Sequence, residues 1–309
     1  MNQTKNSILI THNDMDGSGS EIVMKMYDNN WRKTIFTGYD NINRIVEEVC
    51  NEKKWSDIYI VDICPSEEIV QNLDGRAIII DHHRTTKFLD QMGTHVWDSS
   101  NCATKLFYRF MTKKYQYRNS YLKFLADVID VCDRFVYKTH EDLSEEAYNL
   151  DALHITFGQK QFIKMFDYKR PIMIKKNQSK TILYPTEETI CLQLRNRMMQ
   201  DWDRHAKNCE VFSDKLNRKY GVMFSDEPCS NLFNYIIEQK NLDYLISINV
   251  INKNVSLRSV GNTNVSKLAK KFGGGGHTRA SGFVIKDIKS FLLNSRESLG
   301  LDISDKLIF

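Results

Sequence analysis

The fold is decided by residues 7–17, which read SILITHNDMDG. A run of apolar residues ends in one imidazole and two carboxylates, His12, Asp14 and Asp16, and residues Ser18–Tyr27 then show helical periodicity. Short continuous apolar runs are typical of strands that are buried on both faces of a parallel sheet. The stretch therefore predicts a buried strand, a polar loop at its carboxyl end and a following helix.

The same pattern recurs twice in the next 70 residues. Apolar runs at Asp57–Asp62 and Arg76–Asp81 each end in an aspartate, and helical patterns occupy Asn41–Glu52 and Ser66–Leu73. Strands that alternate with helices indicate an α/β fold with a parallel sheet, in which ligands bind beyond the carboxyl ends of the strands. We therefore expect one site at this edge of the sheet, built from His12, Asp14, Asp16, Asp62, Asp81, His82 and His83.

Four aspartates at one site repel one another unless cations neutralise them. Aspartate oxygens combined with histidine nitrogens suit Mn²⁺, with Mg²⁺ as the alternative, and the lack of thiolate ligands disfavours a structural zinc site. Two such ions about 3.5–4 Å apart, bridged by a carboxylate, are a common arrangement for phosphoester hydrolysis. The sequence thus predicts a metal-dependent hydrolase with two bound Mn²⁺ ions.

The rest of the chain predicts a second, smaller domain. A length of 309 residues favours two domains. Residues 102–166 have a helical pattern, a basic stretch at Lys164–Lys180 marks a boundary, and a second α/β pattern follows a helix at Glu187–His205. We predict a catalytic domain at 1–165, a basic linker and connector helix at 166–204, and a substrate-binding domain at 205–309. Ser99 or Ser100 is expected to cap the helix that follows them.

Composition points to a cytoplasmic protein without a membrane partner. No apolar run reaches the roughly 18–20 residues that span a bilayer, and the N-terminal apolar run is too short for a signal peptide. The seven cysteines are odd in number and form no CxxC pair, which fits a reducing compartment.

Four motifs resemble those of one family. His12-x-Asp14-x-Asp16-Gly17, Asp62 and Asp81-His82-His83 resemble the first three motifs of the DHH phosphoesterases, and GGGGHTRASG at residues 273–282 resembles the signature of the DHHA1 domain. The single DHH core, the modest chain length and the strand at residues 256–259 (SLRS) most resemble the stand-alone branch, which comprises nanoRNase-type oligoribonucleases and related phosphodiesterases of cyclic nucleotides or linear dinucleotides.

The resemblance implies a role for each motif. His12 and Asp14 would hold one Mn²⁺, Asp16 and a histidine of Asp81-His82-His83 the other, and Asp62 would bridge them, so that activated water attacks the phosphorus. His82 is expected to be the metal ligand and His83 to act near the scissile phosphate, although the two could be exchanged. The fourth motif departs from the family pattern; Asp133 is the expected ligand, with Asp130 second and Asp127 also open.

The resemblance also implies that the C-terminal domain binds the substrate across a cleft from the metals. The residues expected to do so are Arg258, Gly273, Gly274, Gly275, Gly276, His277 and Arg279. The sequence as a whole predicts a Mn²⁺-dependent phosphodiesterase that hydrolyses short oligoribonucleotides or dinucleotides to mononucleotides. Three alternatives stay open: a phosphodiesterase of cyclic mono- or dinucleotides, a RecJ-like single-strand exonuclease, and a nucleotide-binding member that does not cleave. The substrate length and a homodimeric state are also undecided.

Overall fold

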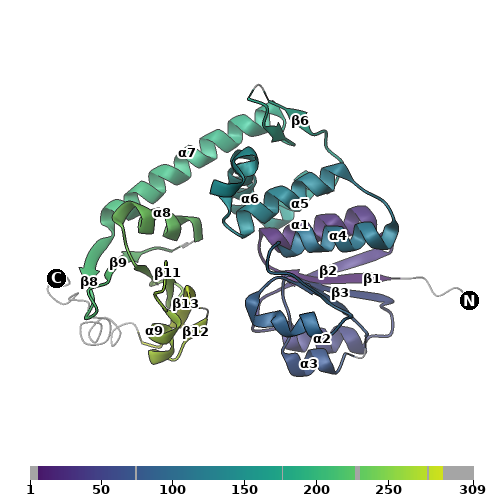
Figure 1. Ribbon diagram of the computed structural model, residues 1–309, viewed down its shortest axis with the longest axis horizontal. Coiled ribbons are helices and arrows are strands. Elements are labelled where there is room, and N and C mark those ends of the chain that lie inside the picture. The colour runs from purple at the N-terminus through teal and green to yellow at the C-terminus, as the bar shows by residue number, and fades with distance from the viewer. Residues whose placement is uncertain (1–5, 74, 176, 227–229, 277, 288–309) are drawn as a thin grey trace, which may run out of the picture. The chain divides into compact units, whose positions relative to one another are not determined.

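The computed structural model describes residues 6–73, 75–175, 177–226, 230–276 and 278–287. The chain forms two compact units, Met1–Arg195 and Asn196–Phe309 (Figure 1). The boundary between them falls inside one long helix, α7 (Pro185–Asn208). Each unit is described separately below.

A five-stranded sheet forms the centre of the first unit, and all of its strand pairs are parallel. The strand order is β2-β1-β3-β4-β5, with bounds β1 (Ser7–His12), β2 (Trp31–Thr37), β3 (Asp57–Val61), β4 (Ile78–Asp81) and β5 (Val96–Trp97). The predicted parallel α/β sheet is thus confirmed. The prediction missed β2 and β5, the two edge strands, because their residues are only partly buried and do not form a continuous apolar run.

Helices cover both faces of this sheet, which explains why its inner strands are apolar throughout. One face packs against α2 (Ile42–Asn51) and α3 (Glu67–Gln71). The other face packs against α1 (Met15–Tyr27) and a helical layer of α4 (Ala103–Tyr115), α5 (Ser120–Asp133) and α6 (Glu141–Phe166) (Figure 1). Short 3₁₀ helices lie at Arg84–Gln91 and Tyr137–Thr139.

A glycine brings α1 unusually close to its neighbours in that layer. A Cβ atom at Gly19 would come within 2.5 Å of Ile129 on α5 and 2.6 Å of the Thr104 hydroxyl on α4. Real Cβ atoms do not approach other atoms so closely, so the three helices can meet only because residue 19 has no side chain. This contact sets the positions of α1 and α4, which both carry parts of the site described below.

The strand order also determines where a ligand would bind. The chain moves from β1 outward to β2 and then returns to β3 on the opposite side of β1. The loops after β1 and β3 consequently leave the sheet in opposite directions and open a crevice between them. Such a switch point at the carboxyl ends of the strands is the usual ligand site of open parallel sheets.

The segment between α6 and α7 is anchored to the first unit rather than loose. It forms a small hairpin, β6 (Met173–Ile174) with β7 (Lys180–Thr181). Arg170 is buried and forms a two-pronged ion pair with Glu187 at 2.7 and 2.8 Å, and Lys175 pairs with Glu188 at 2.7 Å. Two cations of the basic stretch are therefore neutralised by α7.

The second unit contains a six-stranded mixed sheet in the order β12-β13-β11-β10-β9-β8. Its elements are β8 (Glu210–Ser213), β9 (Lys219–Phe224), α8 (Ser230–Lys240), β10 (Tyr244–Asn249), β11 (Asn254–Ser259), α9 (Ser266–Lys271), β12 (Gly275–Gly276) and β13 (Ala280–Val284). Only β9 and β10 pair in parallel. The predicted second α/β domain is confirmed, whereas the predicted final helix lies outside the described residues.

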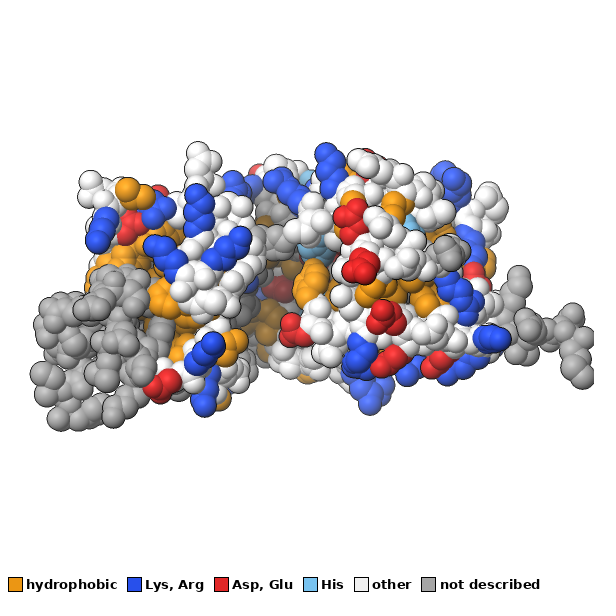
Figure 2. All heavy atoms as spheres, turned by 90° about the horizontal axis from the view of Figure 1, so that it is seen from below, with side chains coloured by type: hydrophobic (Ala, Val, Ile, Leu, Met, Phe, Trp, Pro, Cys, Tyr) orange, Lys and Arg blue, Asp and Glu red, His pale blue; other side chains and the backbone are white. Residues whose placement is uncertain are grey.

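Within the described residues, no helix is long and apolar enough to cross a bilayer. On the face shown in Figure 2, lysine and arginine side chains are scattered among acidic ones and form no continuous band. This distribution agrees with the small net charge of +4.

Candidate metal centre

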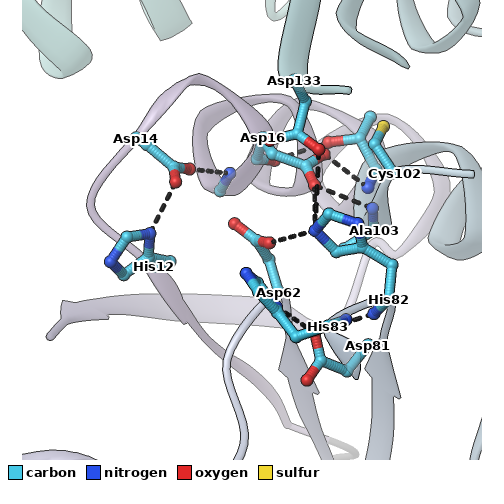
Figure 3. Close-up of polar contacts among 12 residues, drawn as sticks. His12, Asp14, Asp16, Asp62, Asp81, His82, His83, Cys102, Ala103 and Asp133 are labelled. Atoms are coloured by element: carbon cyan, nitrogen blue, oxygen red, sulfur yellow. Dashed lines mark hydrogen bonds and ion pairs between the residues drawn. The ribbon is translucent and has the colours of Figure 1, made fainter. Parts of the chain in front are cut away.

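The carboxyl ends of strands β1, β3 and β4 bring the predicted residues close together. His12 ends β1, with Asp14 and Asp16 directly after it; Asp62 follows β3, and Asp81 ends β4. Their side chains point toward one another across the crevice, together with His82 and with Asp133 from the end of α5 (Figure 3). Three overlapping sets of these residues place potential ligand atoms within 4.8 Å of one another: His12, Asp14 and Asp62; Asp16, His82 and Asp133; and Asp62, Asp81, His82 and His83.

The two carboxylate oxygens of Asp14 make different hydrogen bonds. As the N-cap of α1 it accepts a hydrogen bond from the Gly17 amide through Oδ1 at 2.9 Å. Its other oxygen, Oδ2, lies 2.5 Å from His12 Nδ1. Burial alone would raise the pKa of Asp14, but the hydrogen bond and charge of His12 outweigh it and lower that pKa to about 2. With Nδ1 engaged by the Asp14 carboxylate, Nε2 is the ring nitrogen of His12 that could bind a metal ion.

Asp16 is held by the backbone of α4. Its Oδ2 accepts from the Ala103 amide and its Oδ1 from the Thr104 amide, both at 2.7 Å (Figure 3). The first amides of a helix have no partner inside the helix and carry its positive dipole end, so they favour a carboxylate. The predicted cap at Ser99 or Ser100 was wrong: α4 begins only at Ala103, and the Ser100 hydroxyl binds Asp98 instead.

Asp62 occupies the centre of the cluster in a left-handed backbone conformation. Its φ is 65°, which is uncommon for residues other than glycine and is tolerated best by Asn and Asp. Burial raises the pKa of the Asp62 carboxyl far above its usual range, and the surrounding carboxylates of Asp14, Asp16 and Asp133 raise it further. A strained backbone at such a site is typical of functional residues.

The cluster contains buried polar atoms that lack hydrogen-bond partners. His82 Nε2 lies 3.3 Å from Asp62 Oδ1, 3.6 Å from Asp133 Oδ2 and 3.8 Å from Asp16 Oδ2, beyond ordinary hydrogen-bond distance. Among the described residues, His82 Nε2, Asp62 Oδ2 and Asp133 Oδ2 are all buried without a hydrogen bond. Unpaired buried polar atoms are costly, and several of them within one cluster indicate a missing partner there.

A divalent cation fits this cluster. The unpartnered atoms are carboxylate oxygens and an imidazole nitrogen, which is the donor set that Mn²⁺ and related ions accept. Burial lowers the pKa of His82 and so favours the neutral imidazole that a ligand needs. Burial and the charge of Asp16 raise the pKa of the Asp133 carboxyl, and a cation would relieve both effects.

His83 lies beside His82 in the same cluster and is held by Asp81. His83 Nδ1 donates to Asp81 Oδ1 at 2.7 Å, and the other Asp81 oxygen accepts from the Thr86 hydroxyl at 2.7 Å. Burial would lower the pKa of His83, but the hydrogen bond to Asp81 raises it above its usual value. With both oxygens occupied inside the protein, Asp81 is placed to fix the His83 ring.

The three aspartates of α5 have different surroundings, although a spacing of three residues keeps them near one side of the helix. Asp127 binds Lys123 at 2.6 Å and Lys105 at 3.2 Å. Asp130 is buried and accepts from the Cys102 amide at 2.6 Å and from Lys105 and Arg134. Asp133 is the member that faces His82 and Asp16.

Two residues near the cluster were not singled out from the sequence. Tyr39 follows β2, an unpredicted strand, and its exposed ring lies 5.5 Å from that of His12 and 6.2 Å from that of His83. His154 of α6 lies with its Nε2 3.0 Å from the Ser18 hydroxyl at the start of α1. No sequence pattern could have identified Tyr39 as a site residue, since a single exposed tyrosine in a loop is common.

In the second unit, Arg258 of β11 has no carboxylate partner among the described residues. Its guanidinium lies 5.2 Å from the ring of Phe233 and donates to its neighbour's carbonyl, Leu257 O, at 3.0 Å. Burial lowers the pKa of Arg258. An arginine that is partly buried without an acidic partner is suited to bind an anion. Arg279, by contrast, is exposed.

Part of the glycine run belongs to the sheet of the second unit. Gly275–Gly276 forms the edge strand β12 against β13. Gly273 and Gly276 have φ values of 74° and 127°, and a Cβ at Gly274 would meet the Gly282 carbonyl at 2.1 Å, so these three positions need glycine. A Cβ at Gly275 would meet nothing within 4 Å. His277, predicted to bind substrate, lies outside the described residues.

Comparison with known proteins places the chain in a family. The model of the DHH family, N-terminal domain, matches residues 6–132, and that of the DHHA1 domain matches residues 203–299. Oligoribonuclease NrnB of Bacillus subtilis (strain 168) is 23% identical over 304 residues, which cover 90% of this chain and 73% of that protein.

Solved structures share the fold. The DHH domain of a member of the s1p family of ribosomal proteins has a TM-score of 0.65 at 12% identity, with 96% of this chain and 85% of that chain covered. A pGpG-specific phosphodiesterase from Vibrio cholerae, PggH, has a TM-score of 0.57 at 13% identity, with 95% and 97% covered. By its two matched domains, the chain belongs to the DHH/DHHA1 family of metal-dependent phosphoesterases.

Proposed function

We propose that this protein is a Mn²⁺-dependent phosphodiesterase that hydrolyses short oligoribonucleotides or linear dinucleotides to mononucleotides, with two metal ions. The observation that carries the proposal is that His82 Nε2, Asp62 Oδ2 and Asp133 Oδ2 are all buried without a hydrogen bond within one cluster at the carboxyl ends of the strands. The similarity to an oligoribonuclease and to a pGpG phosphodiesterase supports the choice of substrate.

The ligands divide into two groups that share one residue. His12, Asp14 and Asp62 would hold one ion, and Asp16, His82, Asp133 and Asp62 the other. Bound divalent ions would lower the pKa of water and neutralise the charge on the phosphate. The hydrogen bonds of Asp14 to Gly17 and of Asp16 to α4 fix these carboxylates in advance, so little rearrangement is needed.

His83 is proposed to act on the phosphoester itself. Because Asp81 holds the proton on Nδ1, His83 presents Nε2 toward Tyr39, whose hydroxyl lies 3.4 Å away, and toward the open side of the site. The hydrogen bond to Asp81 raises the pKa of His83 and so favours the imidazolium, which carries a proton on Nε2 as well. From there Nε2 could donate that proton to the leaving oxygen, which would leave His83 neutral, or donate a hydrogen bond to the phosphate. Arg258 in the second unit is proposed to bind a phosphate or base of the same substrate.

The decisive experiment is a turnover panel in Mn²⁺ with chromatographic separation of the products. The panel contains a 5′-phosphorylated diribonucleotide, RNAs of five and ten nucleotides, a cyclic mononucleotide and a cyclic dinucleotide. We expect the dinucleotide to be cleaved at least as fast as the ten-nucleotide RNA, and Asp62→Asn to abolish turnover while the surface variant Asp90→Asn does not.

Each alternative has its own result in this panel. Preference for the ten-nucleotide RNA with strong salt dependence would favour an exonuclease, and preference for a cyclic substrate would favour a cyclic-nucleotide phosphodiesterase. Full activity in excess chelator would contradict the metal mechanism. Restoration of activity by Ca²⁺ as fully as by Mn²⁺ would contradict the proposed ligand chemistry, since Ca²⁺ prefers oxygen ligands alone.

A further inference from the structure

The first unit contains a hollow in a part of α4 and α5 that the proposed function does not use. It has a volume of about 510 Å³. Its walls come from α4, from the loop after it and from the first half of α5. The lining residues are Lys105, Tyr108, Arg109, Thr112, Lys113, Gln116, Arg118, Lys123 and Asp127. None of these residues belongs to the metal cluster.

The hollow is strongly basic, and its lysine and arginine side chains differ in whether they form ion pairs. Lys105 and Lys123 both bind Asp127, and Lys105 also binds the buried Asp130. This neutralises the one acidic residue of the lining.

The other three cations are available. Arg109, Lys113 and Arg118 are exposed and form no ion pair with any residue that the structure describes. Arg109 forms no ion pair with Asp98, but its positive charge helps to lower the pKa of the Asp98 carboxyl.

The spacing of these cations suits a short chain of phosphates. Arg109 and Lys113 are four residues apart on α4, so their backbones are separated by about 6 Å along the helix axis and their side chains lie on the same face. Arg118 approaches from the loop after the helix. Tyr108, Thr112 and Gln116 add neutral hydroxyl and amide groups to the walls. Guanidinium groups bind phosphate oxygens in a two-pronged geometry.

We propose that this hollow is a second anion site, which binds a compound carrying two or three linked phosphates. Its volume lies within the roughly 300–1,000 Å³ of small-molecule sites, which favours a compact ligand over a long strand lying across the surface. A nucleoside triphosphate and inorganic tripolyphosphate share the required chemistry. The site is independent of the metal centre, so it would bind its ligand whether or not the proposed hydrolysis occurs.

The test is isothermal titration of the full-length protein in excess chelator, which removes metal-dependent binding at the catalytic cluster. The probes are ATP, tripolyphosphate, inorganic phosphate and a ten-nucleotide RNA. We expect ATP and tripolyphosphate to bind at least tenfold more tightly than phosphate. The double variant Arg109→Gln/Arg118→Gln should weaken both by tenfold or more, whereas the matched surface variant Lys160→Gln should leave them unchanged. Equal affinities of tripolyphosphate and ATP would show that the site binds the phosphates alone. Tighter binding of ATP would show that the site also contacts the nucleoside.

Two results would overturn the proposal. One is binding of ATP and tripolyphosphate that the double variant does not weaken, provided that its circular dichroism matches that of the unmodified protein. The other is RNA binding that depends on Arg109 and Arg118 without any binding of tripolyphosphate, which would make the hollow part of a strand-binding surface. Turnover of the diribonucleotide in Mn²⁺, measured separately, tests the proposed function alone, and the double variant should retain it.

Discussion

Replacing Asp62 with Asn should stabilise the metal-free protein although it abolishes activity. The carboxyl is buried and lies among those of Asp14, Asp16 and Asp133, which raise its pKa together with burial. Asn has nearly the same shape and tolerates the left-handed φ of 65° that this position requires. The variant therefore removes one negative charge from the cluster with little change to the backbone.

The magnitude follows from the geometry. The ligand atoms of Asp14 and Asp62 lie within 4.8 Å of each other. Two like charges at that distance repel by about 3.5 kcal/mol at an effective dielectric constant of about 20. Proton uptake and relaxation reduce this figure, so we expect the free energy of unfolding to rise by about 1–3 kcal/mol. For a domain of this size, that change corresponds to a Tm increase of roughly 2–12 °C.

The effect should depend on pH in a defined direction. A carboxyl whose pKa is raised in the folded state contributes stability at low pH and loses that contribution as the pH rises through the folded pKa. The Asp62 carboxyl of the unmodified protein titrates in this way, whereas the amide that replaces it in the variant does not titrate. The stability advantage of Asp62→Asn should therefore grow as the pH is raised from 5 to 8.

Thermal unfolding followed by circular dichroism, in chelator and in Mn²⁺, measures both parts of the prediction. A ligand at a hundred times its Kd stabilises a protein by about 2.7 kcal/mol. The unmodified protein should gain this stability in Mn²⁺ and the variant much less, so that their order reverses. Asp90→Asn, on the surface, serves as the control. If Asp62→Asn has a lower Tm than the unmodified protein in chelator at pH 8, the argument from mutual repulsion is refuted.

Three further changes test other parts of the structure. Thr86→Val removes the hydroxyl that binds Asp81 and leaves a buried carboxylate oxygen unpaired, so kcat should fall and denaturant unfolding should show a loss of about 1–3 kcal/mol; an unchanged kcat would argue against a positioning role. Gly19→Ala places a Cβ within 2.5 Å of a side chain of α5 and should cost about 1–3 kcal/mol, whereas Gly38→Ala, in open space, should leave Tm nearly unchanged; equal shifts would contradict the packing argument. Gly275→Val should fold normally and raise KM with little change in kcat, and an unaltered KM would remove Gly275 from the substrate-binding residues.

In the first unit, the sequence predicted the strands that are buried on both sides and missed the two edge strands. The apolar runs of β1, β3 and β4 identify inner strands of a parallel sheet. Strand β2 was not predicted because its first residues include the exposed Arg32 and Lys33, as is common at a sheet edge. In the second unit, the inner strand β9 was also missed although it is largely buried, because Gly221 interrupts the usual strand composition. Patterns of hydrophobicity report burial, and edge strands are only half buried.

For the site, the sequence could propose residues but could not decide between neighbours. Asp130 and Asp133 are three residues apart on one helix, and only tertiary contacts distinguish them: one meets the amide of Cys102 and the other faces His82. The same applies to Ser100, whose expected role at the start of α4 is taken by Asp16 from another segment of the chain. A partner that is distant in sequence leaves no local signal.

The attachment of Asp16 to α4 has a consequence for how the sequence can change over time. Its two donors are main-chain amides, which every amino acid except proline supplies, so most substitutions at residues 103 and 104 would preserve the hydrogen bonds. Proline is otherwise favoured at the first position of a helix, yet at residue 103 it would remove a donor from a proposed metal ligand. The burial of Ala103 and Thr104 limits the size of the side chains in this turn, and the hydrogen bonds to Asp16 add a separate constraint that excludes proline at residue 103, where helix formation alone would favour it.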